Sequence, residues 1–366
     1  MTDTVYMARA LQLAAEGLYT TQPNPRVGCV IVKDGQIVGE GFHARAGQPH
    51  AEVHALQQAG KQANGATAYV TLEPCAHYGR TPPCANALID AQVSRVVIAA
   101  LDSNPLVAGK GQAMLEAAGI STTVGVLEAE AKALNSGFFR RMAGGFPYVR
   151  VKTAASLDGR TAMQSGESKW ITGADARRDV QKWRAQSGAI ITGIGTVLAD
   201  NPSLTVRPQD WTDWHYGEVV QPKRVILDSQ LRMPLDALIL QTMGVIIVTH
   251  QPITHIKVQQ LQALGVDVWC FDSSSSSKID ILQVLTKLAE QGINDVLVEA
   301  GATIAGAFVE ANVVDEWIMY FAPTLLGSDA KPMFDWPVHV MAQQRQLQIA
   351  DLRMVGHDIR LIAKPR

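Results

Sequence analysis

Apolar and polar positions alternate along this chain with two periods, one typical of strands and one typical of helices. Residues 4–18 carry apolar side chains at helical spacing, and Asp3 precedes them as a possible cap. Residues 27–32 and 36–41 are predicted as two strands, and the Asp34-Gly35 pair between them is a strong hairpin signal. The same reasoning predicts strands at 67–72, 95–100 and 122–126, and helices from about His50, from Cys84, at 111–118 and at 127–141.

The second half of the chain repeats this alternation. It predicts strands near residues 148–155, 189–192, 224–227, 245–249, 266–271 and 295–299, and helices near 174–186, 279–291 and 303–311. Late strands are expected near 316–322 and 346–363. Strands that alternate with helices favour an α/β fold in which helices cover both faces of a sheet.

Length and composition indicate that the chain has two domains. A chain of 366 residues is long for one domain, and Gly144-Gly145 followed by Pro147 marks a break. We therefore expect domains at residues 1–145 and 146–366. A net charge of −2 provides no basic surface for nucleic acid, and no apolar run approaches the roughly 20 residues that span a bilayer. Since nothing resembles a signal peptide, we expect a cytoplasmic protein with no membrane partner.

The most informative chemistry lies in His50-Ala51-Glu52, followed by Pro74-Cys75 and then Cys84. One imidazole and two thiolates suit zinc and leave a fourth position for water. A glutamate two residues from the imidazole is placed to carry protons, and this combination is typical of zinc-dependent nucleobase deaminases. The alternative is that these are ordinary reduced thiols, as we expect for Cys29 and Cys270.

Glycine-rich turns in the second half suggest a dinucleotide site. Glu299-Ala300-Gly301-Ala302-Thr303-Ile304-Ala305-Gly306 follows an apolar strand, and Gly193-Ile194-Gly195-Thr196 follows another. Small residues that open a helix let backbone amides approach a phosphate. The alternative, that each is a plain tight connection, stays open.

Two arginines in this half could hold a phosphorylated substrate. Arg184 and Arg207, together with Ser168, offer charge-assisted hydrogen bonds to a phosphate. They could equally be surface ion-pair residues. Asp158, beside Gly159 in a predicted turn, is expected to be structural.

A set of motifs in fixed order resembles one family over essentially the whole chain. The motifs are Pro23-Asn24-Pro25-x-Val27-Gly28, His50-Ala51-Glu52, Thr71-Leu72-Glu73-Pro74-Cys75, Gly79-Arg80-Thr81-Pro82-Pro83-Cys84, Ser156-Leu157-Asp158-Gly159-Arg160 and Glu299-Ala300-Gly301. Together they resemble the bifunctional riboflavin-biosynthesis deaminase-reductases of bacteria. The resemblance implies an N-terminal cytidine-deaminase-like α/β/α domain and a C-terminal α/β domain like dihydrofolate reductase.

The resemblance also implies two successive reactions with Zn²⁺ and NADPH as cofactors. The first is zinc-dependent hydrolytic deamination of 2,5-diamino-6-(ribosylamino)-4(3H)-pyrimidinone 5′-phosphate. The second is the NADPH-dependent reduction of 5-amino-6-(5-phosphoribosylamino)uracil to its ribityl form. The partners are thus small phosphorylated pyrimidines, and we expect a homo-oligomer.

By position, the resemblance assigns roles to individual residues. In the first half His50, Cys75 and Cys84 correspond to the zinc ligands, Glu52 to the proton donor, Asn24 to a pyrimidine contact, and His77 and Arg80 to phosphate contacts. In the second half the NADPH positions are Ala154, Trp170, Thr196, Asp200, Ser229, Gly301, Ala302, Thr303, Ile304, Ala305, Gly306 and Ala307. The substrate positions are Ser168, Arg184, Leu204, Arg207 and Glu299, with Lys152 as an additional polar group near the reacting ribose.

Three other interpretations remain open. A deaminase of nucleic-acid bases would leave residues 147–366 unexplained and would need a basic surface. A non-catalytic nucleotide-binding protein with structural zinc would need a fourth protein ligand. An oxidoreductase with a degenerate first domain would not need an intact His-Ala-Glu and cysteine pair.

Overall fold

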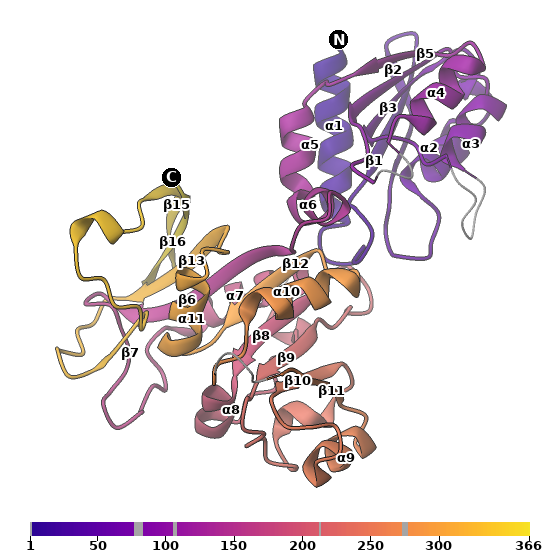
Figure 1. Cartoon of the computed structure of the whole chain (residues 1–366). Helices are drawn as coiled ribbons and strands as arrows, with labels where there is room; N and C mark the ends of the chain where they lie inside the picture. The colour runs from indigo at the N-terminus through magenta and orange to yellow at the C-terminus, as the bar shows by residue number, and fades with distance from the viewer. Residues whose placement is uncertain (1, 77–82, 105–107, 212–213, 273–276) are drawn as a thin grey trace. The chain divides into compact units, whose positions relative to one another are not determined.

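The computed structural model describes residues 2–76, 83–104, 108–211, 214–272 and 277–366. Within these ranges the chain divides into two compact units, Met1–Phe146 and Pro147–Arg366. The colours of Figure 1 run from indigo and magenta in the first unit to orange and yellow at the end of the second. Among the described residues, no helix has the length and apolar character needed to cross a membrane.

The first unit is built around one sheet. Among its described residues this sheet has five strands in the order β2-β1-β3-β4-β5. The strands are β1 (Gly28–Lys33), β2 (Gln36–Phe42), β3 (Thr67–Leu72), β4 (Arg95–Ala100) and β5 (Ser121–Val124). The helices are α1 (Asp3–Glu16), α2 (Ala51–Ala59), α3 (Cys84–Asp90), α4 (Lys110–Ala117), α5 (Glu128–Leu134) and α6 (Ser136–Met142), with a short 3₁₀ turn η1 (Gly60–Ala63).

The predicted hairpin joins β1 and β2. The two strands pair in antiparallel register, with Lys33 opposite Gln36. Asp34 and Gly35 both have positive φ, 49° and 76°. This backbone matches the right-handed twist of two strands joined by a two-residue turn. The structure thus confirms the hairpin that the Asp-Gly pair predicted.

Apolar side chains point outward from both faces of this sheet, as expected for a sheet between two helical layers. On one face Cys29 and Ile31 of β1 belong to a core with side chains of α2, α3 and α4. On the other, Val30 and Val32 belong to a core with side chains of α1, α5 and α6. The α/β/α arrangement therefore follows from the alternation of buried residues along a central strand.

Helix α2 lies unusually close to β2. A Cβ atom on Gly39 would stand 2.1 Å from the carbonyl oxygen of Ala55, and one on Gly41 would stand 2.4 Å from that of Ala51. Only glycine permits such an approach of two backbones. The start of α2, which follows His50, is thereby seated directly on the sheet.

The second unit contains a larger sheet. Among the described residues it has nine strands in the order β11-β10-β9-β8-β12-β6-β13-β16-β15. The strands from β11 to β13 are parallel to their neighbours, and β16 and β15 continue the sheet in antiparallel fashion. The strands are β6 (Tyr148–Ser156), β8 (Ala189–Gly193), β9 (Lys223–Leu227), β10 (Val245–Thr249), β11 (Asp267–Cys270), β12 (Asp295–Glu299), β13 (Glu316–Ala322), β15 (Leu347–Val355) and β16 (Asp358–Pro365).

Helices and short elements complete this unit. The helices are α7 (Ala174–Gln186), α8 (Ile194–Asp200), α9 (Ile256–Ala263), α10 (Ile281–Glu290) and α11 (Ala302–Glu310). The short elements are the strands β7 (Arg160–Ala162) and β14 (Lys331–Pro332), which pair with each other, and the 3₁₀ turns η2 (Pro208–Asp210), η3 (Leu238–Gln241) and η4 (Met341–Gln343).

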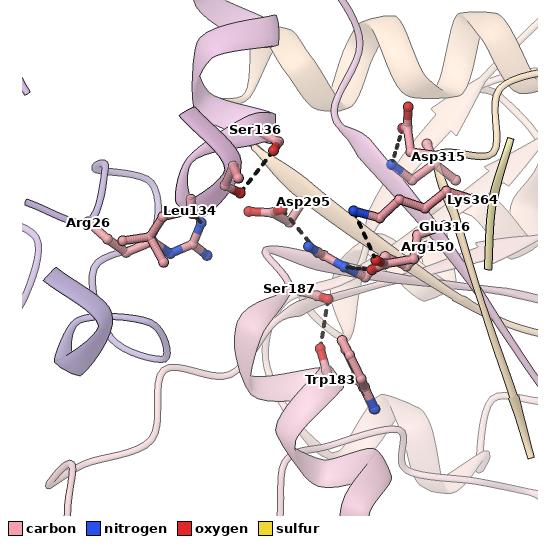
Figure 2. A network of polar contacts seen from close by, with 12 residues as sticks. Arg26, Leu134, Ser136, Arg150, Trp183, Ser187, Asp295, Asp315, Glu316 and Lys364 are labelled. Carbon is pink, nitrogen blue, oxygen red and sulfur yellow. Dashed lines mark hydrogen bonds and ion pairs between the residues drawn. The ribbon is translucent and has the colours of Figure 1, made fainter. Parts of the chain in front are cut away.

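One largely buried arginine links the beginnings of three neighbouring strands. Arg150 on β6 contacts Asp295 at the start of β12 at 3.1 Å and Glu316 at the start of β13 at 2.9 Å (Figure 2). Lys364 on β16 adds a contact of 3.8 Å to Glu316. Because both acids are largely buried, they need this cation to be stable in the fold. The network fixes the end of the sheet opposite to the one where the functional residues gather.

Two expected elements differ in the structure. The helix predicted over residues 127–141 is interrupted at Asn135, which separates α5 from α6. The Asn135 side chain accepts a hydrogen bond from the Arg26 backbone N–H and donates one to the Arg26 carbonyl, both at 2.8 Å. The strand region predicted over 346–363 is a hairpin, β15 and β16, that turns at Gly356, whose φ is 63°.

Candidate active sites

Three elements of the first unit bring its potential metal ligands together. His50 precedes the first residue of α2, Cys75 follows β3, and Cys84 is the first residue of α3. Their ligand atoms lie within 4.8 Å of one another. His50 and Cys84 stand where the chain passes into a helix, and Cys75 lies in the irregular segment that follows β3.

The spacing of the three atoms fits a tetrahedral zinc ion. His50 Nδ1 lies 3.2 Å from Cys84 Sγ and 3.7 Å from Cys75 Sγ. Ligand bonds of about 2.1 Å to nitrogen and 2.3 Å to sulfur would separate such atoms by about 3.6 Å in a tetrahedron. Three ligands leave the fourth position for water or substrate, which is typical of a catalytic zinc site.

Local hydrogen bonds favour thiolate at this site. The Cys84 side chain, the His50 ring and the backbone N–H of Cys84 lower the pKa of Cys75 to about 4, against the burial that raises it. The thiolate form of Cys75 in turn raises the pKa of Cys84. The hydrogen bond with Cys75 also raises the pKa of His50. Cys75 therefore gives up its proton first, and a cation at the centre would be needed to hold both sulfurs as thiolates.

Glu52 lies beside these ligands as a buried acid. Its side chain is 3% exposed, and its Oε2 atom has no hydrogen-bond partner among the described residues. Burial raises the pKa of its carboxyl. A buried oxygen without a partner is rare and needs an explanation, such as a missing ligand or water. The raised pKa makes the carboxyl a better proton acceptor than an exposed glutamate.

A residue that the sequence did not single out joins Asn24 to this centre. His43, 2% exposed, is 3.1 Å from the Asn24 amide through Nε2 and 3.2 Å from the Pro49 carbonyl through Nδ1. Burial lowers the pKa of His43, so the ring is neutral, with Nδ1 donating to Pro49 and Nε2 accepting from Asn24. His43 carries no motif of its own, so sequence alone offered no signal for it. His77 and Arg80 lie outside the described residues.

The second unit contains a cavity of about 1360 Å³ at the carboxyl ends of its parallel strands. Most of the expected cofactor and substrate residues line it. These are Ala154, Trp170, Thr196, Asp200, Ser229, Gly301, Ala302, Thr303, Ile304 and Ala307, with Lys152, Ser168, Arg184, Leu204, Arg207 and Glu299. Such a position is where open α/β sheets bind their ligands.

Two expected cofactor residues do not line this cavity. Ala305 and Gly306 lie on the buried side of α11. A Cβ atom on Gly306 would stand 2.1 Å from the carbonyl oxygen of Asp335. The small residues of this turn therefore have two roles. Gly301 and Ala302 line the cavity, and Gly306 lets the backbone of α11 pack closely against Asp335.

The cavity contains a buried ion pair between Arg184 and Glu299. The guanidinium donates two hydrogen bonds to the carboxylate, at 2.6 and 3.0 Å, and a third to the carbonyl of Thr205 at 3.1 Å. Burial opposes ionisation, but Arg184 and then Lys152 hold the pKa of Glu299 below its ordinary value. Burial also lowers the pKa of Lys152. Arg184 is thus not a surface ion-pair residue, because its partner lies inside the cavity.

Arg207 lies on an irregular segment held by side chains. Its backbone N–H donates to the buried Gln181 side chain at 3.0 Å, and its guanidinium contacts Asp210 at 2.5 Å. Leu204 in the same segment has a φ of +51°, which is uncommon for a residue other than glycine. Neither Gln181 nor Asp210 was expected from the sequence: Gln181 is 26 positions from Arg207, and Asp210, although only three positions away, belongs to no motif.

Comparisons with known proteins agree that each unit has a site of its own. Residues 147–361 match the family model of the RibD C-terminal domain. Residues 1–100 match that of the cytidine and deoxycytidylate deaminase zinc-binding region. The match to the reductase family accounts for the half that a deaminase of nucleic-acid bases would leave unexplained.

Relatives cover the full length of the chain. The riboflavin biosynthesis protein RibD of Haemophilus influenzae is 49% identical over 100% of this chain and 98% of its own. That of Escherichia coli K12 is also 49% identical, over 98% of both chains. Among solved structures, RibD of Acinetobacter baumannii is 53% identical, with a TM-score of 0.93 over 100% of this chain and 99% of its own.

A more distant solved structure also matches the chain over its full length. A diaminohydroxyphosphoribosylaminopyrimidine deaminase/5-amino-6-(5-phosphoribosylamino)uracil reductase from Thermotoga maritima is 32% identical, with a TM-score of 0.85 over 100% of this chain and 99% of its own. These findings confirm the expected fold class, a cytidine-deaminase-like domain followed by an α/β reductase domain, and the zinc and NADPH chemistry that goes with it. The chain therefore belongs to the RibD family and is a bifunctional deaminase and reductase of riboflavin biosynthesis.

Proposed function

We propose that the first unit deaminates 2,5-diamino-6-(ribosylamino)-4(3H)-pyrimidinone 5′-phosphate and that the second reduces the resulting 5-amino-6-(5-phosphoribosylamino)uracil. The observation that carries the first assignment is the buried Glu52 beside the convergent atoms of His50, Cys75 and Cys84. The second rests on a cavity large enough for a dinucleotide and a sugar phosphate together. A boundary between the two activities near Phe146 is part of this proposal.

In the deaminase site, His50, Cys75 and Cys84 would hold the zinc ion. Bound zinc supplies water that is easily deprotonated near neutral pH. Glu52 accepts one proton of the attacking water at Oε2 and delivers it to the ring nitrogen, and it then carries the second proton of that water to the departing amine. Asn24, oriented by His43, holds the pyrimidine ring, since one amide can both donate and accept hydrogen bonds.

In the reductase site, Thr196 in the first turn of α8, Asp200 at its end and the turn from Gly301 that begins α11 would hold NADPH. NADPH supplies the hydride for C1′ of the opened sugar. Lys152 and the Arg184–Glu299 pair place polar groups around that carbon. Arg207 extends from its irregular segment to bind the substrate's phosphate.

The ligand set is tested by replacing cysteines one at a time. We expect Cys75→Ser and Cys84→Ser to lower the zinc content per chain, because a hydroxyl is a poor substitute for thiolate. Cys29→Ser and Cys270→Ser are matched controls that should keep full zinc content. Elemental analysis of the purified variants measures this, and one zinc per chain in both ligand variants contradicts the assignment.

The role of Glu52 is tested by Glu52→Gln. Loss of a proton carrier typically reduces a rate by about 10²–10⁴-fold, so we expect ammonia release to be nearly abolished. Zinc content and NADPH oxidation with the deaminated substrate should remain, because Glu52 is not a ligand and lies in the other unit. Ammonia release and NADPH oxidation are measured separately. A variant that loses zinc, and deaminates normally once zinc is restored, would show Glu52 to be structural.

Arg207 and Arg184 should respond differently to alanine. Arg207→Ala removes a charge-assisted contact worth about 1.5–3 kcal/mol, so substrate affinity should fall about ten- to hundredfold with unchanged NADPH affinity. Arg184→Ala leaves Glu299 buried without its cation, so the protein should also lose about 3–5 kcal/mol of unfolding free energy. Ligand titrations and denaturant unfolding separate the two effects. Weakened NADPH binding with normal substrate affinity in Arg207→Ala would instead assign Arg207 to the cofactor.

We also propose that the protein is a homo-oligomer formed through β15. This strand is the last in its sheet among the described residues, and its exposed apolar side chains include Ile349, Leu352 and Met354, at 59%, 60% and 61% exposure. A long apolar edge strand associates readily with another strand. Antiparallel pairing of two copies about Leu352 places Asp351 of each copy opposite Arg353 of the other, so the charges are complementary. The partner proposed is thus a second copy of this chain.

A single charge on the strand tests this association. We expect Leu352→Lys to convert the oligomer to monomers, because two like charges would meet at the centre of the pairing. Leu264→Lys, at another exposed leucine, is the matched control. Sedimentation equilibrium gives the mass of each variant, and an unchanged mass for Leu352→Lys excludes this interface.

A cytoplasmic location completes the proposal. The deaminase site needs both Cys75 and Cys84 as free thiolates, and a reducing compartment keeps thiols free.

A further inference from the structure

Glu73 lies between the end of β3 and Cys75, and neither of the two proposed reactions uses it. Its side chain is only 4% exposed. Its backbone N–H donates to the carbonyl of Ala100 at 3.0 Å, which continues the pairing of β3 with β4 past the last ladder residue. A buried acid next to a metal-ligand turn needs a structural reason.

Among the described residues, four backbone N–H groups donate to the Glu73 carboxylate. Oε2 accepts from Asp102 at 3.1 Å and from Gly109 at 3.0 Å. Oε1 accepts from Gly111 at 2.9 Å and from Gln112 at 3.3 Å. The last three donors form the N-terminal end of α4 and the residue before it. Glu73 therefore caps α4 from a different part of the chain.

The local sequence explains why α4 needs an external cap. The residue at its N-cap position is Gly109, which has no side chain to accept a hydrogen bond and adopts a φ of 75°. The first N–H groups of a helix have no partner within the helix, and a carboxylate near them is favoured by the helix dipole. A carboxylate can accept four hydrogen bonds, whereas an amide can accept only two. The carboxylate of Glu73 accepts a hydrogen bond from each of the four donors.

The cap also fixes the turn that carries Cys75. A Cβ atom on Gly111 would stand 2.0 Å from the carbonyl oxygen of Pro74, so α4 touches the turn without an intervening side chain. On the other side, the Cys75 carbonyl accepts from Ala85 at 3.2 Å, and Cys75 Sγ accepts from the N–H of Cys84 at 3.3 Å. The turn is thus held between the beginnings of α3 and α4.

We infer that Glu73 is a positioning residue of the deaminase site: by capping α4 it fixes the Pro74 turn and so aims Cys75 at His50 and Cys84. This inference rests on the proposed ligand set. Residues that orient metal ligands without touching the metal change metal affinity about 10–100-fold when they are replaced.

The experiment compares three variants of the full-length protein. Glu73→Gln keeps the size of the side chain but turns an amide nitrogen toward two N–H donors, so zinc affinity should fall about tenfold or more. Glu73→Asp keeps both acceptor oxygens and should recover part of that loss. Competition with a chromophoric chelator measures zinc affinity. In the cobalt-substituted protein, the thiolate-to-cobalt absorption should change in Glu73→Gln and return toward wild type in Glu73→Asp.

Leu115→Ala is the matched control, because it weakens the buried face of α4 and leaves the cap in place. It should lower thermal stability with little change in zinc affinity or in the cobalt spectrum. If Leu115→Ala changes the cobalt spectrum as much as Glu73→Gln does, or if both Glu73 variants bind zinc and absorb as wild type does, the inference is wrong. If Glu73→Gln does not fold, an altered cobalt spectrum in Glu73→Asp supports the inference and a normal one overturns it.

The two proposals fail in different ways. Full zinc affinity in Cys75→Ser would remove the ligand set on which the inference depends. Lost zinc in Cys75→Ser with wild-type behaviour of both Glu73 variants would leave the ligand set intact and remove only the positioning role.

Discussion

A carboxylate taken out of water must be paired with a cation, surrounded by N–H donors or kept ready to bind a proton. Three buried glutamates of this chain represent these three solutions. Glu299 has Arg184 and Lys152, and Glu73 has the backbone donors of α4 and of the loop before it. Glu52 has an oxygen without a described partner and a raised pKa. Glu299 and Glu73 are thus satisfied by their partners, and Glu52 has the raised pKa that suits the proton transfer proposed for it.

The convergence of His50, Cys75 and Cys84 was predictable because each of them belongs to a short motif. His50 and Glu52 are two residues apart, and both cysteines stand where a helix or a turn begins, so the sequence pattern alone specified the residue types and their order. The hairpin at Asp34-Gly35 was predictable for the same reason, since the turn itself demands positive φ. The hairpin depends on two adjacent residues, whereas Cys75 and Cys84 lie 25 and 34 positions after His50 and were each marked by a short motif of their own.

Other features depend on partners far away in the sequence. Arg184 and Glu299 are 115 positions apart, so their pairing followed only from the order of strands in the sheet. The donors to Glu73 lie 29 to 39 positions beyond it. The break at Asn135 depends on Arg26, 109 positions earlier, whereas its own segment has the pattern of one continuous helix. Periodicity cannot detect such contacts, because it describes which face is buried and not what lies against it.

The absence of side chains at Gly39 and Gly41 has a consequence for motion. Helices usually rest on a sheet through layers of side chains, whose rotamer changes let the helix shift slightly over time. Between β2 and the first turns of α2 the backbones are in direct contact, so no layer of side chains separates them there. The beginning of α2, with His50 and Glu52, must then fluctuate together with the strand as one body. The distance from Glu52 to the sheet should accordingly vary little as the protein moves.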